Sequence, residues 1–284
     1  MVSFTNNLKT AALLGLMIGL FMAGGYLLTG TPAGLTFALI IGVIFSGGAW
    51  LFSDKIAITA MRGQEIRPEH DRDLYTMIER LAKNANLPMP RIYRCPQQAP
   101  NAFATGPWPS RAAVAVTDGA LQLLSYDELE GVMAHELAHV KNRDTLTSTV
   151  AAVLAGVFSY LPYMLMFGMG GNRDNPLGLV GVLAFVILSP IAAMLIQMAI
   201  SRSREYVADA DGATIAGSPH GLISALQKLD AVSKRVPMQG EMPTANHMFI
   251  VKPLSAGGNG FSGLFTTHPR TADRIAKLRQ HPMA

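Results

Sequence analysis

The sequence predicts a mainly α-helical integral membrane protein, in which four transmembrane helices carry a cytoplasmic α+β domain with a small β-sheet. The first observation is composition: 50% of the 284 residues are hydrophobic, only 15% are charged, and the mean hydropathy is +0.28. The second is that four long segments carry no acidic or basic side chain. The third is that the charged residues gather in two polar segments with helical and strand-like periodicity.

The four charge-free segments are each long enough to cross about 30 Å of hydrocarbon as a helix. They are Thr10–Thr29, Gly34–Phe52, Leu146–Met169 and Leu177–Ile200. The first, preceded by Lys9, is an alternative candidate for a cleaved signal peptide. Its apolar core is too long for that, no convincing small-residue cleavage site follows, and a second span starts at once. We therefore expect a retained anchor.

The domain organisation follows from these spans. Residues 1–53 hold the first two transmembrane helices and residues 146–200 the other two, while residues 54–145 and 201–284 are the polar segments. Because the two polar segments leave the membrane on the same side, we expect them to form one domain.

Charge asymmetry predicts the orientation. Of the 23 Lys and Arg residues, only Arg173 lies in the two short loops, Gly30–Ala33 and Gly170–Pro176. The positive-inside rule therefore predicts a multi-pass protein with both termini and both polar segments in the cytoplasm. The net charge of +4 requires no nucleic acid as a partner, since basic residues near spans are expected beside anionic lipid headgroups of the bilayer. The single cysteine, Cys95, suits a reducing compartment and is expected to be a buried structural thiol.

Periodicity predicts the elements of the polar segments. Helices are expected at Arg67–Asn86, Ser201–Ala216 and Gly221–Ser233, with a last helix beginning near His268 and Pro269; strands are expected at Arg91–Cys95, Ala102–Thr105 and Ala112–Thr117. The residues from Pro237 to Thr267 are rich in Gly, Pro, Ser and Met and are expected to form a loop.

The sequence His135-Glu136-Leu137-Ala138-His139 has the HExxH pattern. On a helix, positions i and i+4 share one face, so the two imidazoles can bind one Zn²⁺ together. Glu136 lies beside them, where it can accept a proton from an attacking water. Ser125 and Glu128 form a capping box that favours a helix here. The alternative is a helix that carries these three residues by chance.

A catalytic zinc needs a third protein ligand. The continuation HExxHxxGxxH is absent, because Asn142 and Thr145 stand where its Gly and His would be. Glu205, just after the fourth charge-free segment, offers a carboxylate instead. The third and fourth spans should be antiparallel neighbours, so their cytoplasmic ends bring Glu205 and His139 to one point at the membrane surface.

Asp209 lies one helical turn beyond Glu205, where it could accept a hydrogen bond from the outer nitrogen of a ligating histidine. Spacing does not say which histidine it orients. The alternative for this segment is a solvated helix with surface ion pairs Arg204–Glu205 and Arg202–Asp209.

Four motifs together resemble the HtpX-type membrane zinc metalloproteases, in the gluzincin group that also holds the type I CAAX prenyl proteases. They are Asn101–Gly106, Ala134–His139, Glu205–Asp209 and Thr267–Arg270. The resemblance covers nearly the whole chain. It implies a gluzincin-type protease domain with one Zn²⁺ per chain at His135, His139 and Glu205, and Glu136 as the base. It also implies cleavage of misfolded or damaged membrane proteins at the cytoplasmic face of the bacterial inner membrane, as part of a stress response.

Two further roles follow from the resemblance. Asn101, Ala102, Phe103, Ala104 and Thr105 would form an edge strand that pairs with an extended substrate; an ordinary structural strand is the alternative. His268 would donate a hydrogen bond to the oxyanion as the scissile carbonyl is attacked; a helix-capping surface histidine is the alternative.

The predicted function is that of a membrane-embedded zinc endopeptidase acting on unfolded or misfolded membrane proteins. A prenyl-protein endopeptidase is a second hypothesis, although four spans enclose little volume for a lipid-accepting chamber. A non-catalytic membrane scaffold with a structural zinc site is a third. The presence of Glu136 argues against the scaffold, because a structural site needs no base. The oligomeric state stays open.

Overall fold

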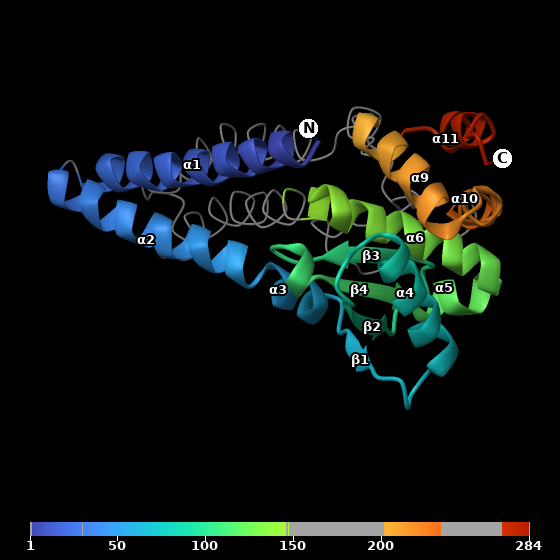
Figure 1. The fold of residues 1–284 in the computed structure, drawn as a ribbon. Helices are drawn as coiled ribbons and strands as arrows, with labels where there is room; N and C mark the ends of the chain where they lie inside the picture. The colour runs from blue at the N-terminus through green and yellow to red at the C-terminus, as the bar shows by residue number, and fades with distance from the viewer. Residues whose placement is uncertain (1, 30, 146, 148–201, 234–268, 284) are drawn as a thin grey trace.

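The structure is a computed structural model that describes residues 2–29, 31–145, 147, 202–233 and 269–283. Figure 1 shows a pair of long helices that extends away from a small sheet covered by shorter helices. The elements are α1 (Val2–Thr29), α2 (Pro32–Leu51), α3 (Ser53–Ala60), β1 (Gln64–Ile66), α4 (Arg72–Asn84), β2 (Arg91–Cys95), β3 (Ala102–Thr105), the short 3-10 helix η1 (Pro109–Arg111), β4 (Ala113–Thr117), α5 (Asp118–Leu123), α6 (Tyr126–Asn142), α9 (Arg202–Ala216), α10 (His220–Ser233) and α11 (Thr271–Leu278).

Helices α1 and α2 form an antiparallel pair. Thr31 caps α2 by accepting a hydrogen bond from Gly34 N–H, and Pro32 occupies its first turn, where a missing N–H costs nothing. Within the described residues, α2 is the one helix long and apolar enough to cross a bilayer. The predicted spans Leu146–Met169 and Leu177–Ile200 lie outside the described residues.

The sheet is mixed, with strand order β1-β2-β4-β3. Strands β2 and β4 are parallel, whereas β1 pairs with β2 and β3 pairs with β4 in the antiparallel sense. The three predicted strands are confirmed, with β4 beginning at Ala113 rather than Ala112. Strand β1 was not expected, because its three residues, Gln64 to Ile66, are too few to show a period. In this strand order, β1 and β3 lie at the two edges of the sheet.

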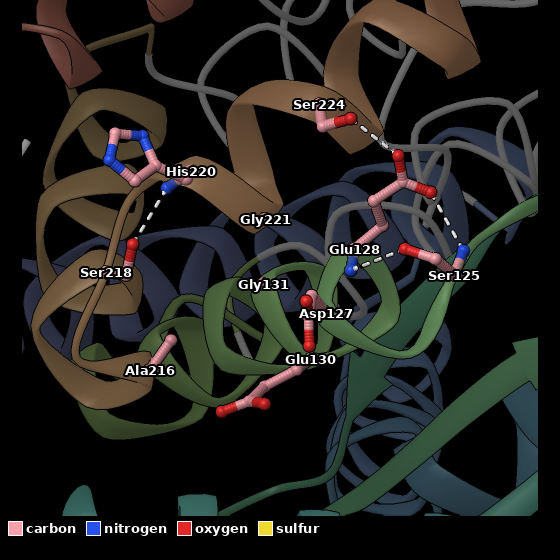
Figure 2. Close-up of a pocket in the computed structure, with 10 residues that line it drawn as sticks. All are labelled: Ser125, Asp127, Glu128, Glu130, Gly131, Ala216, Ser218, His220, Gly221 and Ser224. Atoms are coloured by element: carbon pink, nitrogen blue, oxygen red, sulfur yellow. Dashed lines mark hydrogen bonds between the residues drawn. The ribbon is translucent and has the colours of Figure 1, made fainter.

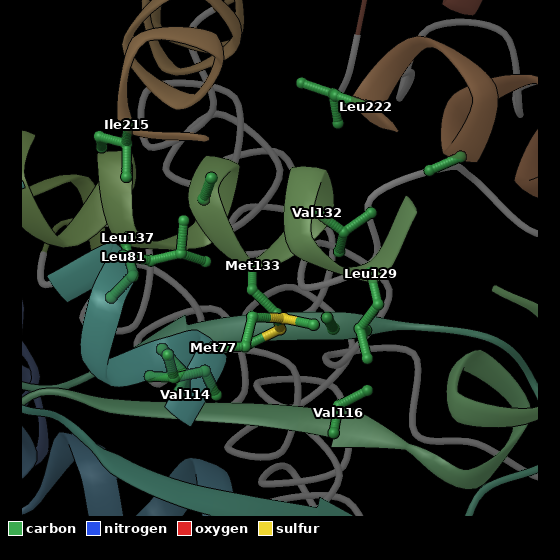
Figure 3. Packing of buried hydrophobic residues seen from close by; sticks show 14 of the residues in the cluster. Met77, Leu81, Val114, Val116, Leu129, Val132, Met133, Leu137, Ile215 and Leu222 are labelled. Atoms are coloured by element: carbon green, nitrogen blue, oxygen red, sulfur yellow. The ribbon is translucent and has the colours of Figure 1, made fainter. Parts of the chain in front are cut away.

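The hydrophobic core lies between one face of the sheet and helices α4, α6, α9 and α10 (Figure 3). It is formed by apolar side chains from each layer, among them Met77, Leu81, Val114, Val116, Leu129, Val132, Met133, Leu137, Ile215 and Leu222. Burying each large side chain contributes roughly 1.5–3 kcal/mol. This core fixes α6 against the sheet, and with it the HExxH residues.

Two close helix contacts depend on glycine. A Cβ on Gly221 of α10 would lie 2.1 Å from Asp127 O of α6, so only glycine allows that crossing. A Cβ on Gly212 of α9 would lie 2.9 Å from His135 Cα, which is closer than Cβ atoms normally approach. Helix α9 can therefore lie directly against the part of α6 that carries His135.

Two predicted helix starts were wrong. Helix α4 begins at Arg72 rather than Arg67, because Asp71 caps it by accepting a hydrogen bond from Leu74 N–H. Helix α11 begins at Thr271, with Arg270 as its N-cap residue. Pro269 therefore precedes the helix rather than occupying its first turn.

Candidate metal centre

The two histidines of the HExxH pattern lie on one buried face of α6. The capping box predicted for this helix is confirmed: Glu128 N–H donates to Ser125 Oγ, and Ser125 N–H donates to the Glu128 carboxylate. One turn separates His135 from His139, and their Nε2 atoms lie 3.2 Å apart. Both nitrogens therefore point to the same place, with the rings nearly perpendicular at 85°.

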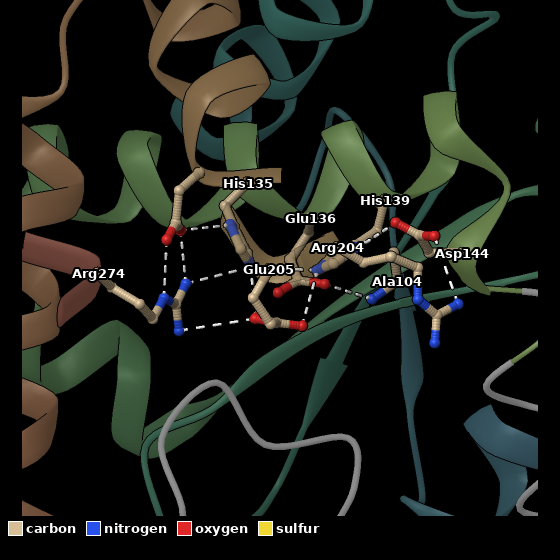
Figure 4. A network of polar contacts seen from close by, with 9 residues as sticks. Ala104, His135, Glu136, His139, Asp144, Arg204, Glu205 and Arg274 are labelled. Atoms are coloured by element: carbon tan, nitrogen blue, oxygen red, sulfur yellow. Dashed lines mark hydrogen bonds and ion pairs between the residues drawn. The ribbon is translucent and has the colours of Figure 1, made fainter. Parts of the chain in front are cut away.

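Glu205 of α9 completes a group of three (Figure 4). Its Oε2 lies 3.7 Å from His135 Nε2, and its Oε1 lies 3.7 Å from His139 Nε2. The three ligand atoms all lie within 4.8 Å of one another, and no other such group occurs among the described residues. Ligand atoms of a tetrahedral zinc site are about 3.3 Å apart. Two imidazoles and a carboxylate at these separations fit a divalent metal ion such as zinc.

Each histidine has a carboxylate at its outer nitrogen. Asp209 Oδ1 lies 3.1 Å from His135 Nδ1, so His135 is the histidine beside which Asp209 lies. Asp144 Oδ2 lies 3.0 Å from Nδ1 of His139. Such partners fix the tautomer and ring orientation of metal-binding histidines.

Sequence reasoning missed Asp144. It follows the end of α6, where Arg143 adopts a left-handed conformation with φ of 59° that interrupts the helix. Helical spacing stops at that residue, so it could not place the carboxylate. The left-handed conformation of Arg143, a non-glycine residue directly after α6, cannot be predicted from the sequence.

Arg274 of α11 was also missed, although it is 1% exposed and lies within the site. Its Nε and Nη2 contact the two carboxylate oxygens of Asp209 at 2.9 and 2.7 Å. Its Nη1 lies 3.7 Å from Glu205 Oε2, and its Nη2 lies 3.4 Å from His135 Nε2. Asp209 therefore pairs with Arg274 of the C-terminal helix. The other carboxylate beside a histidine, Asp144, also has an arginine nearby, because Arg204 Nη1 lies 3.5 Å from Asp144 Oδ1.

Buried charges shift the pKa values of the site. Burial alone lowers the pKa of His139, but the hydrogen bond to Asp144 and the charge of Glu205 outweigh it and raise that pKa to about 9. Burial raises the pKa of Asp209, but the charge of Arg274 and the contact with His135 outweigh it and lower that pKa to about 2. Asp209 is therefore a carboxylate at neutral pH.

Glu136 lies between the histidine pair and the edge strand. Its Oε2 accepts a hydrogen bond of 3.0 Å from Ala104 N–H of β3. Burial raises the pKa of Glu136, opposed by the charges of His135 and His139. A carboxyl group with a raised pKa beside a pair of histidines is suited to accepting and returning a proton.

Strand β3 contains the predicted substrate-binding residues Ala102 to Thr105, and Asn101 precedes it. The backbone of Asn101 is bonded to Thr117, through its N–H to Thr117 Oγ1 and its C=O to Thr117 N–H. Alternation along the strand then turns the backbone groups of Ala102 and Ala104 away from β4. Ala102 is fully buried, and the Ala104 N–H is bonded to Glu136. The predicted catalytic residue His268 lies outside the described residues.

A pocket of about 380 Å³ lies at the N-terminal end of α6, away from the histidine pair, against the turn between α9 and α10 (Figure 2). It is lined mostly by polar and small residues: Ser125, Asp127, Glu128, Glu130, Gly131, Ala216, Ser218, His220, Gly221 and Ser224. Ser224 Oγ donates to Glu128 Oε1 at 2.5 Å within it. None of the residues of the histidine centre lines this pocket.

Two histidines one turn apart, a carboxylate from a second helix and a buried glutamate at an edge strand define a metallopeptidase. The chain belongs to peptidase family M48, whose sequence profile matches residues 68–281. It is similar to bacterial proteins called Protease HtpX homolog. That of Desulfatibacillum aliphaticivorans is 51% identical over 279 residues, covering 96% of this chain and 89% of the relative. That of Syntrophotalea carbinolica is 47% identical over 282 residues, covering 96% and 98%.

The fold is similar to that of the crystal structure of S. mikatae Ste24p, with a TM-score of 0.54 and 18% identity. The match covers 98% of this chain and 66% of that chain, so this chain spans just under two thirds of the Ste24p structure. The likeness extends to the fold alone. Together, the family and the curated relatives make this chain a membrane metalloprotease.

Proposed function

We propose that this chain is a zinc-dependent endopeptidase that cleaves unfolded or misfolded segments of membrane proteins at the cytoplasmic face of the bacterial inner membrane. One observation carries the proposal. The ligand atoms of His135, His139 and Glu205 lie within 4.8 Å of one another, with Glu136 beside them. The donor set of two imidazoles and one carboxylate is that of known zinc peptidases.

The residues of this chain divide the chemistry between them. When bound by His135, His139 and Glu205, zinc would supply Lewis-acid polarisation of the scissile carbonyl and would lower the pKa of a water. Glu136 accepts the proton of the attacking water and passes it to the leaving amine. His268 donates a hydrogen bond to the developing oxyanion.

The edge strand supports an unfolded substrate. The backbone groups of Ala102 and Ala104 face away from β4, and the Ala104 N–H is bonded to the proposed base. An extended peptide can add to such an edge through main-chain hydrogen bonds. A folded domain would first have to unfold locally, at a cost of several kcal/mol, so disordered segments are cut faster.

The proposed location is the inner membrane, with several spans and a cytoplasmic active site. It is supported by the apolar length of α2, by the bacterial relatives and by the distribution of Lys and Arg. The bilayer and unfolded membrane proteins are the proposed partners, and nucleic acid is not among them.

The alternatives are less well supported. Curated relatives named as HtpX proteases match 96% of the chain, which favours protein quality control over prenyl-protein cleavage. A structural zinc site would not need a buried carboxyl group beside the histidines. The contact of Glu136 with the edge strand therefore favours catalysis over a scaffold.

The test is Glu136→Gln in the purified, full-length protein in detergent. Zinc content should stay near one per chain, because the ligands are intact, while cleavage of an unfolded protein such as casein falls about 10²–10⁴-fold. Glu130→Gln is the matched control, since Glu130 lies on the same helix and pairs with Arg80 instead. Near-normal cleavage by a zinc-loaded Glu136→Gln protein would remove Glu136 from the mechanism.

A further inference from the structure

The connection between β3 and β4, residues 106–112, meets the end of the long helix α2. Figure 1 shows η1, in green, lying beside the junction of α2 and α3 rather than over the core. The Trp108 ring lies 5.8 Å from the ring of Trp50, in an edge-to-face arrangement at 70°. These two residues are the only tryptophans in the chain. The connection therefore contacts the C-terminal end of α2 and, through Arg111 and Asp54, the start of α3.

The position of Trp50 sets the depth of this contact. Trp50 is the second-last residue of α2, whose 20 residues make a helix about 30 Å long. Large apolar side chains along α2 face outward, including Phe37 at 67% and Ile44 at 65% exposure. A helix of this length that crosses the hydrocarbon has its ends at the headgroup level, where tryptophan is favoured. Trp108 packs against Trp50 and so lies at the same level.

Basic groups accompany the two aromatic rings. Arg111 lies over the Trp108 ring at 5.3 Å, and Lys55 lies over the Phe52 ring at 5.6 Å. The acidic residue of this junction, Asp54, is 1% exposed and pairs with Arg91 and Arg111. The surface of the junction thus combines indole rings with cationic groups, a combination that matches anionic phospholipid headgroups.

We propose that residues 106–112 form a membrane-contact loop, in which Trp108 and Arg111 dock into the anionic headgroup layer beside Trp50. Thr145 Oγ1 donates to Gly106 O at 3.4 Å, so the loop is also tied to the segment that follows α6. The proposed loop begins directly after Thr105, the last residue of β3. Ala104 is four residues from Trp108, which corresponds to at most about 14 Å of chain.

A consequence for substrates rests on the proposed function. A peptide paired along β3 would lie within about 14 Å of the headgroup layer. The site would then receive segments that emerge directly from the membrane. The loop would thereby favour substrate segments that lie close to the membrane surface.

Fluorescence quenching tests the loop without using proteolysis. In the full-length Trp50→Phe variant, Trp108 is the sole tryptophan. After reconstitution into phosphatidylcholine–phosphatidylglycerol vesicles, lipids brominated close to the headgroup should remove roughly half of its emission. Lipids brominated near the chain ends should remove less, because the ring lies at the interface. In the same variant, Arg111→Gln should weaken the quenching when the anionic lipid is present and have little effect in phosphatidylcholine alone.

The control places a tryptophan at the far end of α6. Tyr126 is half exposed and lies about 25 Å along the helix from Asn142. Trp50→Phe, Trp108→Phe, Tyr126→Trp should be quenched by aqueous iodide and not by brominated lipid. Thermal melting identifies any variant that has not folded.

Two results would overturn the proposal. Quenching of Trp108 by lipid that is no stronger than in the Tyr126→Trp control would place the loop away from the bilayer. Shielding of Trp108 from both brominated lipid and iodide would mean that protein, such as a second copy of the chain, covers it. Either result leaves the proposed peptidase activity standing, since that depends on the Glu136→Gln experiment.

Discussion

Arg274 Nη2 lies 2.7 Å from Asp209 Oδ1, and Nε of the same guanidinium lies 2.9 Å from Oδ2. The two residues are 65 positions apart, on α11 and α9, and both are at most 2% exposed. This paired contact fastens the C-terminal helix to the carboxylate that orients His135. A charge-assisted bidentate pair is among the strongest polar contacts available to a protein.

Arg274→Met should destabilise the protein by about 3–5 kcal/mol, because it leaves the Asp209 carboxylate buried without its partner. Adding Asp209→Asn should recover part of that loss, since the uncompensated charge is then removed. Chemical denaturation in detergent measures both. Arg279→Met, on the exposed side of the end of α11, is the control and should change stability by less than about 0.5 kcal/mol. Additive effects of Arg274→Met and Asp209→Asn would mean that the two residues do not act as a pair.

Asp144→Ala should weaken zinc binding about 10–100-fold, because His139 loses the acceptor at its outer nitrogen. Asp144→Asn should cost less, since its amide oxygen can still accept that hydrogen bond. Competition with a chelator measures the affinity. The control is Asp127→Ala, which removes an exposed carboxylate from the first turn of the same helix. Equal zinc affinity in Asp144→Ala and wild type would show that the ring of His139 is held by packing alone.

Stability should fall in acid through Glu128. Burial raises its pKa, but hydrogen bonds from Lys228, Ser224 and Ser125 N–H outweigh it and lower that pKa from 4.5 to about 2. A carboxyl group with a depressed folded-state pKa stabilises the fold above its unfolded pKa and loses that contribution as pH falls through the folded one. The contribution, roughly 3 kcal/mol, should disappear between about pH 5 and pH 2.

Denaturation curves at a series of pH values test this expectation. Glu128→Gln should be less stable than wild type at pH 7, and the difference should shrink towards pH 2. Glu130→Gln, two positions along α6, should keep the wild-type pH profile because the Glu128 contacts remain. A stability difference between Glu128→Gln and wild type that does not change with pH would contradict the argument.

Local pattern was enough to predict the helix of His135 and His139, its capping box, and the strands Arg91–Cys95 and Ala102–Thr105. Glu205 was also predicted as a candidate ligand, because the third and fourth predicted spans were expected to be antiparallel and to end close together. Missed elements were short: β1 and α3 have three and eight residues and show no clear period. Helix starts were misplaced where a cap such as Asp71 decided the boundary.

By itself, the sequence determined which residues share a face or a turn. Spacing along one element is a property of the chain, so it put His135 and His139 on one side of a helix. Only the tertiary structure decided which groups outside one regular helix meet: Asp144 at His139 after the left-handed residue Arg143, Arg274 at Asp209, and Ala104 N–H at Glu136. The physical reason is that these contacts depend on the break in the helix at Arg143 and on the packing of separate elements, such as the close approach of Gly212 to His135. A short window of sequence contains neither.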